Sequence, residues 1–392
     1  MASYRAIGKG LLLGAAALSL WAVTRRATGR APRLINWERV RAIALSMSRS
    51  EESVPGLSRI ERSWQYRQWV HRSEKAISEY LGLALPQALE SVHVFDRADW
   101  IDANISNFRD MFEPFEQFNQ QVMSNSSNGT RLMGSINQLL LTSQLGALIG
   151  YLSQRVLGQY DTALLGKEHI GGGKLYFVEP NIEILQERLG LKPDELRLWI
   201  ALHEVTHAFE FEANPWLRQY MNSLLTRYLE TVTKDVSRIQ GENAGLGKML
   251  GRVATNVFKG GNLIEWVMSP DQRAIFQELQ ALMCLVEGYS NHVMQQVGQG
   301  LLSSYHWMKE RFEERNKSKS QAEKWFTRLT GLDAKYEQYA LGERFVNEVV
   351  RQKGIGFVNR VWQSPALLPT MEEIRRPDQW VQRVSRLAPL TS

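Results

Sequence analysis

The chain has 392 residues, a formal net charge of +6 and a single cysteine, Cys284. Hydrophobic residues make up 44% of the sequence and charged residues 22%, a composition that excludes a disordered or fibrous chain and is typical of a globular protein. One cysteine excludes an intrachain disulfide and any zinc site built from several thiolates.

The N-terminal segment, residues 1–34, is basic and apolar. Residues 10–24 carry no charge, and arginine or lysine residues stand on both sides of them. As a helix this stretch would extend about 22 Å, short of the hydrocarbon core of about 30 Å. We interpret residues 7–24 either as a short membrane anchor or as a packed helix of a soluble protein. Downstream arginines disfavour a cleaved signal peptide. If residues 7–24 are an anchor, the same arginines place the main domain on the cytoplasmic side. We therefore expect the protein in the cytoplasm or on the cytoplasmic face of a membrane.

The positive charge is concentrated near the N-terminus. Residues 1–75 contain fourteen Lys or Arg and five Asp or Glu, so the remaining residues are close to −3 in net charge. This basic part carries no nucleic-acid-binding motif. We therefore expect no nucleic-acid partner.

Hydrophobic periodicity predicts a mainly α-helical protein in which residues 35–392 form one domain. A β-prone run at residues 175–178, with residues 159–161 before it, predicts a small hairpin or sheet. The predicted helices cover residues 36–48, 59–81, 98–122, 133–157, 181–189, 194–213, 215–240, 271–297, 299–315, 321–330 and 340–352.

The most informative stretch is His203-Glu204-Val205-Thr206-His207, inside the predicted helix 194–213. Two histidines four residues apart project from the same face of a helix. That spacing allows both imidazoles to bind one Zn²⁺, with Glu204 beside the metal as the general base. The alternative is a pair of buried histidines that find protein partners in the core.

A catalytic zinc ion needs a third protein ligand. Glu287 is our candidate, because it ends the apolar stripe of the predicted helix 271–297, where an unpaired carboxylate would be costly. Glu230 and His292 are the alternatives. Tyr289 and His292 are close enough in sequence to Glu287 to support the ligands or to act as oxyanion donors.

These residues predict a Zn²⁺-dependent hydrolase with a peptide or amide substrate, in which Glu204 activates water. Two alternatives belong to other classes of protein. One is a zinc-binding scaffold without turnover, and the other is a membrane-associated interaction protein in which the motif is accidental.

The sequence also resembles a zincin-like metallopeptidase family of bacterial proteins, some of which carry a label for association with deazaflavin-coenzyme biosynthesis. The resemblance lies in the stretch from His203 to Phe211, in Pro215-Trp216-Leu217, in Glu287-Gly288-Tyr289 and in several C-terminal motifs, and it covers most of residues 35–385. It implies a zincin-like helical fold, with zinc on His203, His207 and Glu287. The label implies little about mechanism.

Overall fold

The computed structural model of the protein describes residues 33–48, 56–124, 128–161, 173–241, 269–317 and 332–387. The chain divides into two compact units: unit 1 comprises Met1–Glu52 and Arg97–Arg155, and unit 2 comprises Ser53–Asp96 and Val156–Ser392. Almost all of the predicted segment 1–34 lies outside the described residues. The sequence-based division into residues 1–34 and 35–392 therefore stays a prediction.

Unit 1 is helical. Gly146 and Gly150 let two of its helices approach closely, because a Cβ atom at Gly150 would lie 2.9 Å from the Ala44 carbonyl oxygen. In the part of the chain that the structure describes, no helix combines the length and the apolar character that a membrane span requires. Among the described residues, the helices of unit 1 are α2 (Trp37–Ser48), α4 (Arg97–Ser124) and α5 (Asn128–Ser153).

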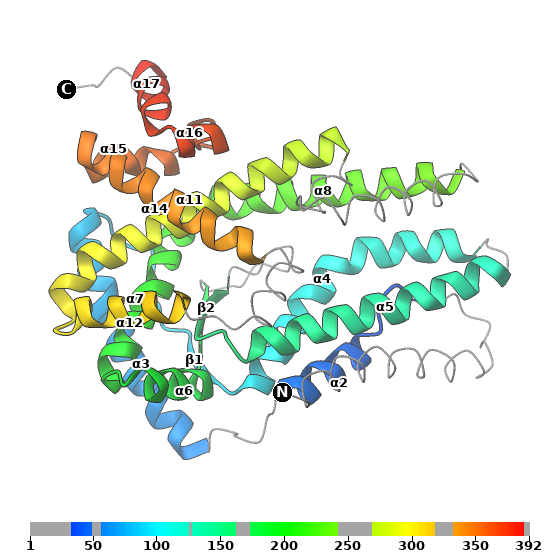
Figure 1. Ribbon diagram of the computed structural model, residues 1–392, viewed down its shortest axis with the longest axis horizontal. Helices are drawn as coiled ribbons and strands as arrows, with labels where there is room; N and C mark the ends of the chain where they lie inside the picture. The colour runs from blue at the N-terminus through cyan, green and yellow to red at the C-terminus, as the bar shows by residue number, and fades with distance from the viewer. Residues whose placement is uncertain are drawn as a thin grey trace. The chain divides into compact units, whose positions relative to one another are not determined.

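Unit 2 combines a small sheet with the remaining helices, and in it α8 and α11 lie side by side (Figure 1). The prediction of a mainly α-helical protein is confirmed. The predicted helix 321–330 falls outside the described residues. The elements of unit 2 are α3 (Gly56–Leu81), β1 (Val92–Phe95), β2 (Gly158–Asp161), β3 (Lys174–Val178), α6 (Glu179–Leu189), α7 (Pro193–Glu212), α8 (Pro215–Gly241), α11 (Pro270–Leu301), α12 (Tyr305–Lys317), α14 (Leu332–Lys353), α15 (Ile355–Val358), η2 (Asn359–Trp362), η3 (Pro365–Leu367), α16 (Met371–Arg375) and α17 (Pro377–Leu387).

The sheet has the strand order β1-β3-β2, so β2 lies at an edge. β2 pairs with β3 in antiparallel orientation, as the two predicted β-prone runs suggested, and β1 pairs with β3 in parallel. β1 has no counterpart among the elements predicted from the sequence. On one face of the sheet the ring of Phe177 stacks on Tyr66 of α3, with 4.1 Å between ring centroids.

The two ends of α7 are set by local sequence. α7 begins at Pro193, with Asp194 and Glu195 in its first turn, and it ends two residues before Asn214-Pro215. α11 begins with a complete capping box between Ser269 and Gln272. Both helix starts agree with the sequence-based prediction.

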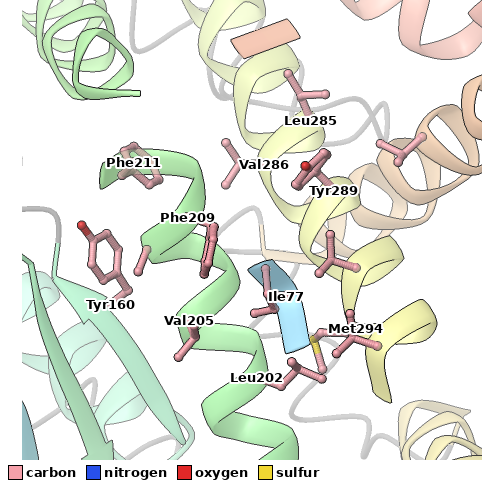
Figure 2. Close-up of a cluster of buried hydrophobic side chains, with 14 of the residues drawn as sticks. Ile77, Tyr160, Leu202, Val205, Phe209, Phe211, Leu285, Val286, Tyr289 and Met294 are labelled. Atoms are coloured by element: carbon pink, nitrogen blue, oxygen red, sulfur yellow. The ribbon is translucent and has the colours of Figure 1, made fainter. Parts of the chain in front are cut away.

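Apolar side chains fill the space between α7 and α11. Figure 2 shows Leu202 and Phe209 of α7 near Val286, Tyr289 and Met294 of α11. All five side chains are at most 5% exposed. Burial of these side chains stabilises the helix pair by about 25 cal/mol per Å² of apolar surface removed from water, and so fixes one helix against the other.

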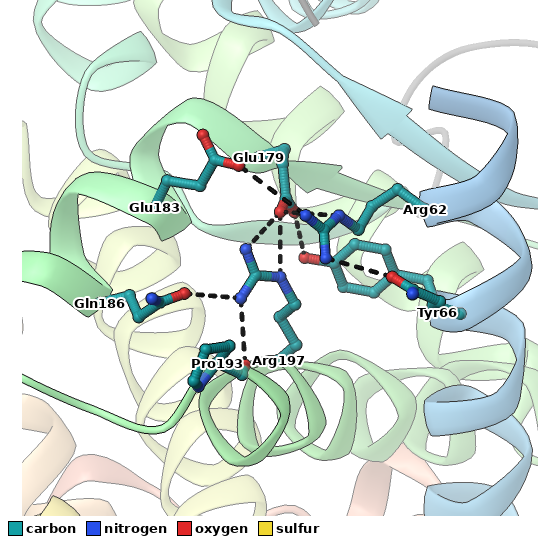
Figure 3. A network of polar contacts seen from close by, with 8 residues as sticks. Arg62, Tyr66, Glu179, Glu183, Gln186, Pro193 and Arg197 are labelled. Atoms are coloured by element: carbon teal, nitrogen blue, oxygen red, sulfur yellow. Dashed lines mark hydrogen bonds and ion pairs between the residues drawn. The ribbon is translucent and has the colours of Figure 1, made fainter. Parts of the chain in front are cut away.

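A buried ionic network fastens the N-terminal part of α7 to the end of the sheet (Figure 3). Glu179, directly after β3, accepts hydrogen bonds from Arg197 of α7 and from the hydroxyl of Tyr66. Arg197 also donates to the Gln186 side chain at 2.8 Å, and Arg62 lies 3.2 Å from Glu179. Arg197 and Glu179 are 1% and 2% exposed, so water and salt screen the attraction between their charges only weakly.

Candidate metal centre

Two imidazoles project from α7 towards α11. The rings of His203 and His207 lie 4.7 Å apart between centroids, at an angle of 75°. Both side chains are partly buried, with 26% and 14% of their surface exposed. One turn of helix therefore presents two imidazoles side by side.

Glu287 of α11 completes, with His203 and His207, a group of three side chains that could hold a metal ion. One ligand atom of each of the three lies within 4.8 Å of the others. His203 Nε2 is 4.0 Å from Glu287 Oε2. Two imidazoles and a carboxylate are a known ligand set of catalytic zinc sites, which leave one coordination position open. The residues present therefore fit a zinc ion.

Glu287 owes its position to a close crossing of α11 and α14. A Cβ atom on Gly288 would lie 2.1 Å from the carbonyl carbon of Gly342, and a Cβ atom on Gly342 would lie 1.9 Å from the oxygen of Cys284. Only glycine permits this backbone approach. The crossing fixes α11 at the residue next to Glu287.

Glu204 is held by the edge strand. The backbone N–H of Tyr160 donates to Glu204 Oε2 at 2.8 Å, and a Cβ atom at Gly158 would lie 2.8 Å from Oε1. Glu204 is 6% exposed. Burial raises the pKa of Glu204 to about 7, although the neighbouring His207 and the Tyr160 N–H both favour the ionised form.

Our sequence analysis missed two polar residues of the site, Glu210 and Ser290. His207 Nδ1 lies 2.8 Å from Glu210 Oε2. The Ser290 hydroxyl is 3.2 Å from His207 Nδ1 and donates to Glu210 Oε1 at 3.3 Å. The available signal was the spacing, since Glu210 follows His207 by three residues and Ser290 follows Glu287 by three.

The two histidines have different surroundings. His203 Nδ1 lies 3.0 Å from the thioether sulfur of Met294. Burial, together with the charge of His207, lowers the pKa of His203. Burial acts in the same direction on His207, but the Glu210 carboxylate outweighs it and raises the pKa of His207.

The other candidates lie apart from this group. The Tyr289 hydroxyl donates to Asn359 at 2.7 Å, and His292 makes its hydrogen bonds with Tyr80 and Asn347. Neither His292 nor Glu230 is in the metal-binding group found among the described residues. A supporting or oxyanion role for Tyr289 and His292 stays a prediction.

Comparisons with known proteins identify the family of the chain. A family model described as zincin-like metallopeptidase matches residues 35–381. A crystal structure from Chloroflexus aurantiacus, described as a proposed hydrolase with a novel fold, is 41% identical in sequence, covers 90% of this chain and 99% of its own, and has a TM-score of 0.65. No curated protein matches the sequence. The chain belongs to the zincin-like metallopeptidase family.

Proposed function

We propose that the protein is a zinc-dependent hydrolase that cleaves a peptide or amide bond. The observation that carries the proposal is the convergence of His203, His207 and Glu287 from two helices, with their ligand atoms within 4.8 Å of one another. Family membership supports the same reaction class. His203, His207 and Glu287 would hold the ion.

Glu204 is the general base of the proposed reaction. A zinc ion held at this site would lower the pKa of a bound water molecule towards ~7 and polarise the carbonyl group of the substrate. Glu204 accepts the proton of the attacking water and passes it to the leaving amine. The Tyr160 N–H holds Oε2 of Glu204, so we assign the proton transfer to Oε1.

The test compares zinc content and hydrolysis in matched variants. Zinc is measured by elemental analysis of protein purified without chelator, and hydrolysis with a fluorogenic peptide library. We expect Glu204→Gln to keep zinc and lose hydrolysis, because the amide cannot accept the proton. His207→Ala and Glu287→Ala should lose both. Glu230→Gln, on an exposed position of α8, is the control and should keep both.

Each outcome separates the proposal from its rivals. Hydrolysis by Glu204→Gln at the wild-type rate would remove Glu204 from the reaction. If the wild type binds stoichiometric zinc but hydrolyses no member of the library, the result would favour a zinc-binding scaffold. A wild-type protein without zinc would make the motif accidental.

A further inference from the structure

We propose that Glu210 is a positioning residue of the metal centre, which orients His207 and raises its affinity for zinc. Ser290 holds Glu210 in place. This inference deepens the proposed zinc site and rests on it.

The first support is the register of the two helices that carry the ligands. On α7, His203, His207 and Glu210 follow one another at spacings of four and three residues, which places them on one face. On α11, Glu287, Ser290 and Met294 follow at three and four residues and form the facing stripe. The two stripes meet where His203 contacts Met294 and Glu287, and where His207 and Glu210 contact Ser290, so the ligands occupy only part of each stripe.

The second support is that one nitrogen of each imidazole, Nδ1, already has a protein partner. Nδ1 of His207 contacts the Glu210 carboxylate, and Nδ1 of His203 contacts the Met294 sulfur. A partner at Nδ1 fixes the proton on that nitrogen and leaves Nε2 to bind a metal. The geometry thus selects Nε2 as the ligand atom of both histidines, which agrees with the 4.0 Å between His203 Nε2 and Glu287 Oε2.

The third support is the burial of Glu210. Its side chain has no exposed surface, and burial of a carboxylate is costly unless it is paired. His207 and Ser290 both contact it. A carboxylate partner strengthens an imidazole ligand, whereas a thioether is only a weak acceptor. The two histidines are therefore held with different strength, and His207 is held more firmly.

The experiment measures zinc affinity of the full-length protein by competition with a chromophoric chelator. Glu210→Gln keeps the shape of the side chain and removes its charge, and we expect zinc affinity to fall roughly 10- to 100-fold. Ser290→Ala should give a smaller loss in the same direction. Met294→Leu should change the affinity roughly threefold or less, because a thioether contact is weak.

The control is Glu373→Gln. Glu373 is another largely buried carboxylate of unit 2, and it pairs with Arg383 and caps α16. This variant should bind zinc with wild-type affinity. A second readout is the imidazole ¹⁵N spectrum of the zinc-loaded protein, in which the wild-type His207 proton should reside on Nδ1 and be slow to exchange. In Glu210→Gln that proton should exchange faster while the backbone amides of α7 and α11 keep their wild-type exchange rates, whereas a loss of global stability would speed the exchange of all of them.

The possible results distinguish a failure of the positioning role of Glu210 from a failure of the proposed zinc site. Zinc affinity of Glu210→Gln within twofold of the wild type, with an unchanged His207 proton, overturns the positioning role and leaves the zinc site intact. A wild type without measurable zinc affinity refutes the proposed function itself. If Glu210→Gln does not fold, Ser290→Ala decides, and a wild-type affinity in that variant overturns the inference.

Discussion

The backbone N–H of Tyr160 in the edge strand β2 donates a hydrogen bond to Oε2 of Glu204, with 2.8 Å between nitrogen and oxygen. The strand therefore holds the proposed general base directly. Gly158, two residues earlier on the same strand, supplies the space for its carboxylate. Glu204 thus couples the sheet to α7 at the proposed metal site.

Gly158→Ala should break this coupling. The new Cβ atom would lie 2.8 Å from both Cγ and Oε1 of Glu204, so the carboxylate must move from the Tyr160 N–H. We expect a loss of about 1–3 kcal/mol in the free energy of unfolding. Urea unfolding monitored by circular dichroism measures it.

The matched control for Gly158→Ala is Gly300→Ala, near the end of α11, where a Cβ atom meets no neighbour within 4 Å. That substitution should leave the midpoint of urea unfolding unchanged or raise it, because alanine stabilises a helix more than glycine does. Equal midpoints for Gly158→Ala and the wild type would contradict the proposed contact.

Gly342→Ala tests the helix crossing that positions Glu287. The added Cβ atom would lie 1.9 Å from the Cys284 carbonyl oxygen, so α14 must move away from α11. We expect destabilisation of about 3 kcal/mol or more, and a weaker zinc affinity because Glu287 moves with its neighbour Gly288. Thermal unfolding and chelator competition measure the two effects.

Gly356→Ala in α15 is the control for the helix crossing, because its Cβ atom would point into open space. Its unfolding midpoint and zinc affinity should match those of the wild type. A Gly342→Ala protein as stable as this control would show that the two backbones are farther apart than we describe.

The ion pair between Arg197 and Glu179 should be strongly coupled. Removal of Glu179 leaves the buried Arg197 guanidinium without a carboxylate, so Glu179→Gln should cost about 3–5 kcal/mol. Arg197→Met should cost less, because Glu179 keeps its ion pair with Arg62. The double variant should lose much less than the sum. A double-mutant cycle from urea unfolding measures the coupling.

Arg311 and Glu314 provide an exposed reference pair on α12, three residues apart and with 46% and 68% of their side chains exposed. Their coupling should stay below about 1 kcal/mol. If the stability losses of Arg197→Met and Glu179→Gln simply add in the double variant, the two residues do not act as one unit.

Acid should weaken the protein through Glu195. Burial raises the pKa of this carboxyl, but hydrogen bonds from Ser303, Ser304 and Lys192 outweigh burial and lower the pKa to about 2. A depressed pKa in the folded state adds stability above the unfolded value near 4.3, and that contribution disappears as the pH falls towards 2. The free energy of unfolding of the wild type should therefore decrease over this range.

Glu195→Gln removes the titrating group while it keeps the size of the side chain. The stability difference between wild type and variant should be constant above pH 5 and shrink as the pH falls towards 2. Urea titrations at a series of pH values measure this difference. A difference that does not change with pH would contradict the assignment.

Much of the fold follows from local sequence. Pro193 and Asn214-Pro215 delimit α7, and the capping box at Ser269 starts α11, so both helices could be located without a structure. The group formed by His203, His207 and Glu287 follows as well, from helical spacing and from the cost of a carboxylate at the end of an apolar stripe.

The parts that sequence analysis missed depend on packing between distant segments. β1 is only four residues long, and its partner β3 lies about eighty residues later, so no local pattern distinguishes it from a loop. The contact between Tyr160 and Glu204 requires the sheet to lie against α7. Glu210 was within reach of helical spacing, but its role depends on Ser290 of α11.

The order of the units along the chain has a consequence for biosynthesis. Unit 1 interrupts unit 2 between Asp96 and Val156, so β1 leaves the ribosome long before β3 can pair with it. Glu287 is translated eighty residues after His207. A nascent or truncated chain that stops before α11 carries both imidazoles without Glu287, so the proposed metal centre can form only after α11 has been translated.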